Sequence, residues 1–170
     1  MNDAAASRTH LVLTWRCVPF DSLSARELQA IHRARQRVFV VEQDCAFLDA
    51  DPLDERAQHL AAWATGEPDP VAYARLLPPS ARYTEASIGR VLTSPALRGR
   101  GIGRELMARA LTLVAAMWPR AGVRISAQTR LEPFYASLGF VAVGAPYVED
   151  GIDHTEMLHA AAEAPLHAHA

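Results

Sequence analysis

Three arginines and three glycines occur within seven consecutive residues near the middle of the chain. With one isoleucine among them, they stand in the order Arg98, Gly99, Arg100, Gly101, Ile102, Gly103 and Arg104. Glycine leaves the backbone free to turn its N–H groups towards a ligand, and the first N–H groups of a following helix carry partial positive charge. A phosphate or pyrophosphate is the natural ligand of such a loop. The residues predict an anion site made by the backbone N–H groups of residues 99–104 and the three arginine side chains.

Several common anion-binding and catalytic motifs are absent from the sequence. All 17 basic residues are arginine, so a Walker-A lysine, a Schiff-base lysine and a lysine general base are excluded. The dinucleotide fingerprint would need a glycine where Arg104 stands. The chain has no G-x-S-x-G or H-E-x-x-H motif, and neither Cys17 nor Cys45 has an evident base beside it. Nucleophilic and metal-dependent hydrolases are therefore poorly supported, and we expect no metal.

The composition is that of a single globular domain. The 170 residues, half of them apolar, are enough for one well-buried core and short for two. We expect one domain over residues 10–160, with unanchored ends at residues 1–9 and 161–170. The net charge is −2, no apolar run reaches 18 residues, and the first residues lack a basic and apolar leader. Together with two distant cysteines, these features predict a cytoplasmic protein that does not bind membranes.

Hydrophobic periodicity separates helices from strands along the chain. The capping-box pair Ser24 and Glu27 begins a helix predicted over residues 25–39, and an apolar stripe predicts a second helix over residues 101–117. Gly139 ends a short helix over residues 134–138. Strands are predicted at residues 11–15, 59–64, 71–77, 87–93, 123–127, 140–143 and 154–158. A meander followed by strands alternating with helices predicts a mixed α/β sheet with helices on its faces.

A strongly acidic stretch, residues 42–55, contains six carboxylates in fourteen positions. As a calcium loop starting at Asp49 it fails, because Asp54 replaces the required glycine and Leu60 replaces the required glutamate. Two interpretations stay open. The stretch is either a solvated acidic loop or a negative rim that attracts a cationic substrate.

Two motifs together resemble the GNAT superfamily of acyl-CoA-dependent N-acyltransferases. Arg98, Gly101 and Gly103 form R-x-x-G-x-G between an apolar strand and a helix, as in that superfamily's pyrophosphate-binding motif. The second motif, F-Y-x-x-x-G-F, spans residues 134–140. Further stretches are similar to the ElaA-type branch, at residues 38–45, 88–91 and 149–154. The resemblance implies a single-domain α/β fold with a mixed, mostly antiparallel sheet flanked by helices.

The resemblance also implies direct attack of an amine on the thioester of acetyl-CoA. A backbone N–H group of Val91, Leu92 or Thr93 would polarise the thioester carbonyl, provided that the strand ladder is splayed there. Tyr135 is the implied acid that protonates the leaving thiolate. Gln128 stands where many members carry an asparagine, and its amide is the expected contact to the pantetheine arm.

The acceptor amine must lose a proton before it attacks, which requires a base or a chain of waters. Glu42 and His154 are the candidate bases, because each lies in a stretch similar to the ElaA-type branch and at the edge of a predicted element. A surface or capping role stays open for both.

The predicted activity is acetyl transfer from acetyl-CoA to a primary amine of a small molecule or peptide, and the acidic stretch favours a cationic amine. The alternative is a non-catalytic acyl-CoA-binding sensor or interaction module, because a fold does not fix a function. Nucleic acid is not expected as a partner, because the chain is slightly acidic and its aromatic residues are not interleaved with the arginines. A homodimer is left open.

Overall fold

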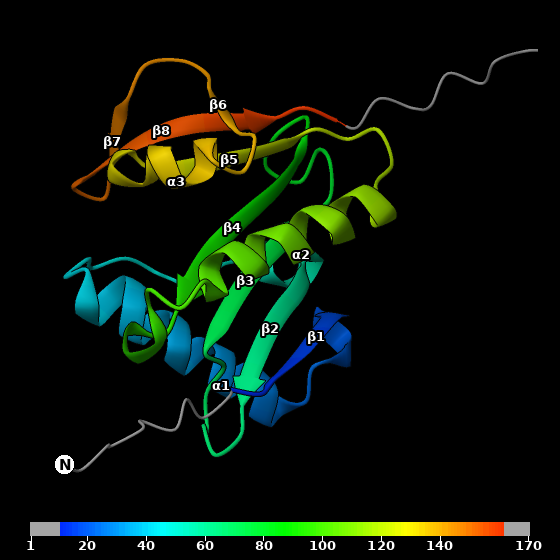
Figure 1. Ribbon diagram of the computed structural model, residues 1–170, viewed down its shortest axis with the longest axis vertical. Helices are drawn as coiled ribbons and strands as arrows, with labels where there is room; N and C mark the ends of the chain where they lie inside the picture. Colours follow the sequence, from blue (N-terminus) through cyan, green and yellow to red (C-terminus); the bar gives the residue numbers. More distant parts are fainter. Residues whose placement is uncertain (1–10, 162–170) are drawn as a thin grey trace, which may run out of the picture.

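One sheet of eight strands runs through the computed structural model, which describes residues 11–161 (Figure 1). Its strands follow the order β1-β2-β3-β4-β5-β8-β6, and β7 pairs with the beginning of β8. Every neighbouring pair is antiparallel except β4 and β5, which are parallel. The prediction of a mixed, mostly antiparallel sheet flanked by helices is confirmed. The predicted ends, residues 1–9 and all but the first of residues 161–170, lie outside the described residues.

The strands and helices follow the predicted sequence order. The strands are β1 (Leu13–Pro19), β2 (Gln58–Ala64), β3 (Ala72–Leu77), β4 (Ala86–Thr93), β5 (Val123–Gln128), β6 (Val141–Ala142), β7 (Tyr147–Glu149) and β8 (Ile152–His159). The α-helices are α1 (Ala25–Arg35), α2 (Ile102–Met117) and α3 (Glu132–Ala136). β7 was not expected from the sequence, and a two-residue turn joins it to β8. Both turn residues, Asp150 and Gly151, have positive φ, as such hairpin turns require.

The first helix changes its form before it ends. Ser24 caps α1 by accepting a hydrogen bond from the Glu27 backbone N–H, and the Glu27 side chain bonds back to the Ser24 backbone. After Arg35 the chain continues in wider π-helical turns, η2 (Gln36–Glu42). The predicted end at residue 39 therefore falls inside a helical segment that carries Glu42 at its last position. π-helical turns occur frequently at functional sites.

The second helix covers one face of the sheet. Leu106, Met107 and Ala110 on α2 are fully buried, in a cluster with the small residues Ala72 and Ala74 of β3. Alanines on the strand let the helix backbone approach the sheet closely. The apolar stripe predicted for this helix therefore forms its buried side, and it fixes the start of α2 against the end of β4.

The first helix lies on the opposite face of the sheet (Figure 1). Ile31 and Ala34 of α1 pack with Tyr73 and Leu92, whose side chains point away from α2. The sheet is thus covered on both faces near its centre. Among residues 11–161, no helix is long and apolar enough to cross a membrane.

Candidate active site

A large cavity opens where two neighbouring strands separate. β4 and β5 pair only through Ala86 and Ser87, the first two residues of β4. Figure 1 shows the two strands diverging from this end. The residues that follow on both strands line a cavity of about 920 Å³. Successive residues of a strand direct their N–H groups to alternate sides, so N–H groups of β4 beyond Ser87 face a side that β5 has left.

β4 also contains a bulge near its centre. Arg75 of β3 pairs with Gly89, but Tyr73 pairs with Leu92. Between these two pairs β3 has one residue, Ala74, and β4 has two, Arg90 and Val91, which leaves one extra residue on β4. Arg90, at this point, has a φ of 51°, in the left-handed region that residues other than glycine seldom adopt. The bulge changes which backbone groups of β4 face the cavity.

Contacts on both sides of the Arg90 guanidinium stabilise this conformation. Its Nε donates a hydrogen bond of 2.8 Å to the Asp49 carboxylate, and the guanidinium carbon lies 5.2 Å from the centre of the Phe47 ring. The residues after the bulge are those expected to polarise a thioester. All three line the cavity: Val91, Leu92 and Thr93.

The glycine loop forms the next part of the cavity wall. Gly99 and Gly101 have φ values of 76° and 81°, and a Cβ atom at either position would meet nothing within 4 Å. These two glycines are therefore needed for backbone conformation, not for space. Six loop residues line the cavity: Arg98, Gly99, Gly101, Ile102, Gly103 and Arg104. The first N–H groups of α2, a helix of 16 residues, belong to this loop, which gives the cavity wall a positive partial charge.

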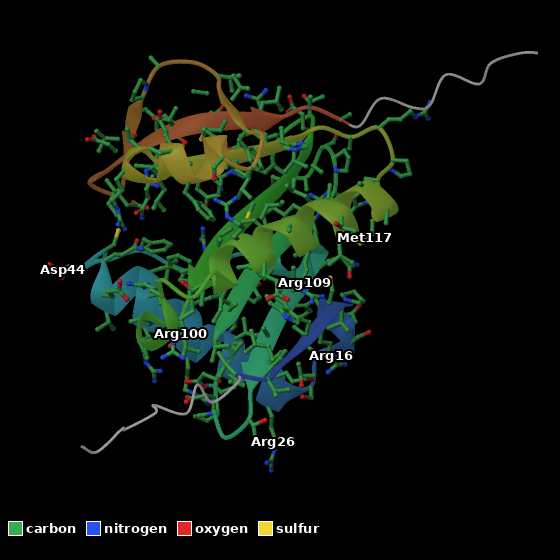
Figure 2. The ribbon with its side chains drawn as sticks, viewed as in Figure 1. Arg16, Arg26, Asp44, Arg100, Arg109 and Met117 are labelled. Atoms are coloured by element: carbon green, nitrogen blue, oxygen red, sulfur yellow. The ribbon has the colours of Figure 1, made fainter. Side chains whose placement is uncertain are left out.

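The three arginines of the loop have different surroundings. Arg98 forms a bidentate ion pair with Glu42, with nitrogen–oxygen distances of 2.6 and 2.9 Å. Arg104 donates a hydrogen bond of 2.8 Å to the Ser137 hydroxyl. Arg100, labelled in Figure 2, is exposed and does not line the cavity. The structure therefore brings two of the three predicted arginines to the cavity.

Tyr135 reaches the same cavity from α3. Its ring is buried in edge-to-face contact with Phe134 and Phe140, with ring centres 5.1 and 5.9 Å away. Burial raises the pKa of the Tyr135 hydroxyl to about 12. Tyr135 lines the cavity, and among residues 11–161 no group is hydrogen-bonded to its hydroxyl. Such a hydroxyl is protonated at neutral pH and can donate a hydrogen bond to negative charge that develops on a leaving thiolate.

Gln128 and His154 face the cavity from adjacent strands, paired in register. The Gln128 amide is engaged at both ends, because it donates to Gln43 and accepts from Arg130, each at 3.0 Å. His154 Nδ1 lies 2.8 Å from the carbonyl oxygen of Ile152. A carbonyl only accepts, so Nδ1 is the donor, and in the neutral imidazole the lone pair is on Nε2. Nε2 of His154 can therefore accept a proton.

The acidic stretch folds back on three arginines that come from elsewhere in the chain. Three of its six carboxylates form ion pairs of 2.7 to 2.8 Å with guanidinium groups. The carboxylates are Asp49, Asp51 and Asp54, and the arginines are Arg35, Arg75 and Arg90. The interpretation as a solvated loop is wrong for these three carboxylates. A negative rim would keep only Glu42, Asp44 and Glu55, of which Glu42 is itself paired with Arg98.

Asp54 lies at the centre of this network. It is 4% exposed and accepts hydrogen bonds of 2.8 Å from both Arg35 and Arg75. Burial alone would raise the pKa of the Asp54 carboxyl, but the two guanidinium groups outweigh it and lower the pKa to about 2. The network joins α1, the acidic stretch and β3 behind the bulge of β4.

Several residues of the cavity wall were not predicted from the sequence. A local sequence pattern could have identified only some of them. Ser126 alternates with the buried residues Ile125 and Ala127 along β5, so the period of two could have placed it on the opposite face. Glu149 lies on β7, a strand that was not predicted. Arg90 carried no local signal, because its bulge exists only through the register between β3 and β4.

Comparison with known proteins gives a consistent result. The sequence matches the acetyltransferase (GNAT) domain family over residues 29–160. A UPF0039 protein of Synechocystis is 44% identical over 146 residues, which cover 86% of this chain and 94% of that protein. The crystal structure of an acyl-CoA N-acyltransferase from Pseudomonas aeruginosa superposes with a TM-score of 0.82 at 41% identity, over 88% of this chain and 100% of that one. Escherichia coli ElaA superposes with a TM-score of 0.81 at 37% identity, over 87% and 99% of the two chains.

Proposed function

Because the chain belongs to the GNAT acetyltransferase family, we propose that it transfers an acetyl group from acetyl-CoA to a primary amine of a small molecule or peptide. Membership of the family makes it an acyltransferase with acyl-CoA as co-substrate. One observation carries the proposal further. The glycine loop, the bulged segment of β4 and Tyr135 all line one cavity.

The proposed site for the pyrophosphate of CoA is the glycine loop. Backbone N–H groups of residues 99–104 and the side chains of Arg98 and Arg104 supply the positive charge there. Arg98 must exchange its Glu42 carboxylate for a phosphate oxygen, and Arg104 must exchange only a neutral hydroxyl. The Gln128 amide would likewise exchange Gln43 or Arg130 for the pantetheine arm.

The proposed oxyanion donor is a backbone N–H group of Val91, Leu92 or Thr93. The separation of β4 from β5 and the bulge at Arg90 both support this role, because they leave N–H groups without a strand partner at the cavity. A donor fixed before the reaction stabilises the negative charge that develops on the thioester oxygen without reorganising in the transition state.

Tyr135 is the proposed acid and His154 the proposed base. The Tyr135 hydroxyl is protonated at neutral pH, and it would donate a hydrogen bond to the sulfur of CoA and then its proton as the C–S bond breaks. His154 has a fixed tautomer with the Nε2 lone pair available. Glu42 remains a second candidate base, but the bidentate pair with Arg98 occupies both of its oxygens. The geometry therefore favours His154 over Glu42.

In the proposed reaction, the neutral amine attacks the thioester carbonyl carbon and forms a new C–N bond. The tetrahedral oxyanion collapses and the C–S bond breaks. The thiolate takes the Tyr135 proton, and the amine nitrogen loses its proton to His154 Nε2. After proton exchange with solvent, the products are the N-acetyl amine and CoA with a free thiol.

Three further expectations belong to this proposal. A cationic acceptor is still expected, because a primary amine is an ammonium ion at neutral pH. The acidic stretch supports it less than the sequence suggested, because arginines neutralise Asp49, Asp51 and Asp54. The cytoplasm is the expected compartment. The oligomeric state, for which a homodimer was left open, would be measured by light scattering on the purified chain.

Titration calorimetry with acetyl-CoA, followed by a thiol-release assay over a panel of primary amines, tests the proposed function. We expect one-to-one binding of acetyl-CoA and amine-dependent appearance of free CoA thiol with the matching N-acetyl product in mass spectra. Absence of acetyl-CoA binding would overturn the proposal. Binding without thiol release across the panel would favour the alternative, a non-catalytic acyl-CoA-binding sensor or interaction module.

A further inference from the structure

One face of the outer sheet is polar and carries no helix. Along β5 and β8, the residues Ile125, Ala127 and Met157 are buried in the same core as α2. The alternate residues point to the other face, and among them Ser126, Gln128 and His154 line the cavity. α1 covers that other face only over the central strands, through contacts with residues of β2, β3 and β4. The cavity therefore has a polar floor that lies away from the α2 side of the sheet.

A hydrogen-bonded cluster occupies this floor. The Ser126 and Tyr147 hydroxyl groups are 2.5 Å apart, and the Glu149 carboxylate lies 3.4 Å from the Ser126 hydroxyl. The Tyr147 ring stacks on the His154 ring at 6.1 Å between centres. Glu149 thus lies on the strand that pairs with the beginning of β8, two residues from Tyr147, which pairs with the proposed base His154.

Four carboxylate side chains line the cavity, and they differ in the number and length of their hydrogen bonds and ion pairs. Both oxygens of Glu42 are bound by Arg98, and Asp51 is bound by Arg75 at 2.7 Å. Asp150 is exposed at the tip of the β7–β8 turn. Glu149 is half-buried, and its contacts within residues 11–161 are the two long ones, to Ser126 at 3.4 Å and to Arg82 at 3.5 Å. Glu149 is the half-buried carboxylate with capacity for a cation.

The arginines that line the cavity divide in the same way. Three are held by short ion pairs to carboxylates, namely Arg75, Arg90 and Arg98. Arg104 and Arg130 bond to neutral side chains beside the glycine loop and the end of β5. Arg82 is different, because its ion pair within the described chain is the 3.5 Å contact to Glu149, and its guanidinium also lies 5.2 Å from the Tyr83 ring centre. Arg82 therefore has capacity for an anion.

We propose that Glu149 and Arg82 form the acceptor subsite and bind the ammonium and carboxylate groups of a free α-amino acid. The proposal rests on the proposed acetyl transfer and names the substrate class for it. In an α-amino acid the two opposite charges sit on one carbon atom, a few ångströms apart. A weakly paired carboxylate and guanidinium, 3.5 Å from each other, match that arrangement. Each protein charge then gains a short charge-assisted partner in place of one long contact.

Other acceptor classes leave part of this subsite unsatisfied. A diamine would pair with Glu149 but would place a second cation near Arg82. An amino acid amide or ester would leave the guanidinium without an anion. The acceptor binds as an ammonium group, so its nitrogen loses two protons in the reaction. The neighbouring His154 Nε2 takes the first from the ammonium group at Glu149 and passes it to solvent before the attack, and it takes the second after the C–N bond has formed.

Initial rates of thiol release test the proposal with matched acceptors and acetyl-CoA. For each of several side chains, the free amino acid is compared with its amide and with the decarboxylated amine. We expect kcat/KM for the free amino acid to exceed kcat/KM for the amide and for the decarboxylated amine by about tenfold or more. Both of these compounds lack the carboxylate, so each loses one charge-assisted ion pair. Equal or better rates for the amides or amines would overturn the proposal, while the acetyl transfer itself would stand.

Variants of Arg82 and Glu149 test which group of the amino acid each side chain binds. Arg82→Gln should raise KM for the free amino acid about tenfold with kcat kept, and should leave the amide unchanged. Glu149→Gln should raise KM for both. Arg26→Gln is the matched control, because Arg26 is exposed and lies far from the cavity (Figure 2). An Arg82→Gln variant that still prefers the free amino acid would contradict the assignment of Arg82.

Binding measurements separate this proposal from the acetyl-transfer proposal. If no acceptor releases thiol, free amino acids are titrated into the protein saturated with CoA. Binding that Arg82→Gln weakens and Arg26→Gln does not would support the subsite, although the acetyl transfer would have failed. Absence of amino acid binding to the CoA-loaded protein would overturn the subsite.

Discussion

Arg98 and Glu42 form a bidentate ion pair across the mouth of the cavity, with nitrogen–oxygen distances of 2.6 and 2.9 Å. Arg98 opens the glycine loop, and Glu42 is the last residue of the π-helical segment η2. Both residues line the cavity, and both side chains are partly exposed. The guanidinium that the glycine loop would offer to a phosphate is therefore already occupied by a carboxylate of the same chain.

Glu42→Gln should tighten the binding of CoA. The variant removes a negative charge that competes with the pyrophosphate for the donors of Arg98, and because the pair is partly exposed we expect a gain of about threefold. Titration calorimetry of CoA at low ionic strength measures it. Glu85→Gln is the control, since Glu85 also forms an ion pair with an arginine, Arg124, and does not line the cavity. Weaker binding in Glu42→Gln would mean that Glu42 positions Arg98 for the phosphate instead of competing with it.

Tyr135→Phe should lower turnover by about 100-fold and leave CoA affinity nearly unchanged. The hydroxyl has no partner among residues 11–161, so its removal breaks no hydrogen bond of the described fold, and the ring contacts with Phe134 and Phe140 remain. Because the Tyr135 pKa is raised to about 12, its ionisation should not produce a limb in the pH–rate profile of the wild type below pH 10. Steady-state kinetics and CoA titration measure both effects. Unchanged kcat in the variant would remove Tyr135 from the mechanism.

His154→Gln should lower kcat and keep CoA affinity, because it removes the lone pair proposed to accept the amine proton. Glutamine at this position keeps a polar side chain of similar reach. Glu42→Gln provides the comparison, because Glu42 is the second candidate base. A larger loss of kcat in Glu42→Gln than in His154→Gln would assign the base to Glu42 and not to His154.

Local patterns in the sequence were sufficient to predict the loop and the helix that form the proposed co-substrate site. The spacing of Arg98, Gly101 and Gly103 before an amphipathic helix predicted a turn and a helix start, and both depend on residues close in the chain. The buried stripe of α2 followed from its helical period in the same way. Neighbouring residues determine such features, so a single sequence contains them.

The features that shape the acceptor side depend on residues far apart in the chain. The extra residue at Arg90 is defined only by the register of β4 against β3, and the ion pairs of Asp49 link it to Arg35 and Arg90. A run of carboxylates has the same local appearance whether it is solvated or paired with buried arginines. From the sequence, the acidic stretch could be either a solvated loop or a negative rim. Only the tertiary structure shows that three of its carboxylates pair with arginines.

Gly101→Ala should destabilise the fold by about 1 kcal/mol and weaken CoA binding. The residue has a φ of 81°, and a Cβ there meets nothing within 4 Å, so the expected cost comes from the backbone conformation alone. Gly103→Ala is the matched control. Gly103 lies in the first turn of α2 without a positive φ, and its Cβ would make ordinary contacts of 3.7 and 3.9 Å. Alanine there should stabilise the helix by about 0.5 kcal/mol or more.

Denaturant unfolding of the two glycine variants, with CoA titration, measures these changes. Equal stability of Gly101→Ala and Gly103→Ala would contradict the role given to the left-handed conformation. A Gly101→Ala variant that keeps full CoA affinity would show that the loop backbone contributes little to holding the pyrophosphate.

Asp54 should make the protein sensitive to acid in a defined range. Its carboxyl pKa is lowered from 3.8 to about 2 in the folded state, so the unfolded chain binds the proton more readily as the pH falls. The stabilisation is complete above about pH 4 and is lost as the pH falls through 2, and its size is about 2 kcal/mol. Urea unfolding of the wild type between pH 5 and 2 measures this loss.

Asp54→Asn should remove this part of the pH dependence and lower stability at neutral pH by about 3 kcal/mol, because Arg35 and Arg75 stay buried with one carboxylate fewer. Asp21→Asn, at an exposed position, should keep the wild-type pH profile. If Asp54→Asn does not fold, a carboxyl-detected NMR titration of the wild type should still find one aspartate that titrates about two pH units below the exposed ones. An Asp54 signal that titrates near pH 4 would contradict the ion pairs with Arg35 and Arg75.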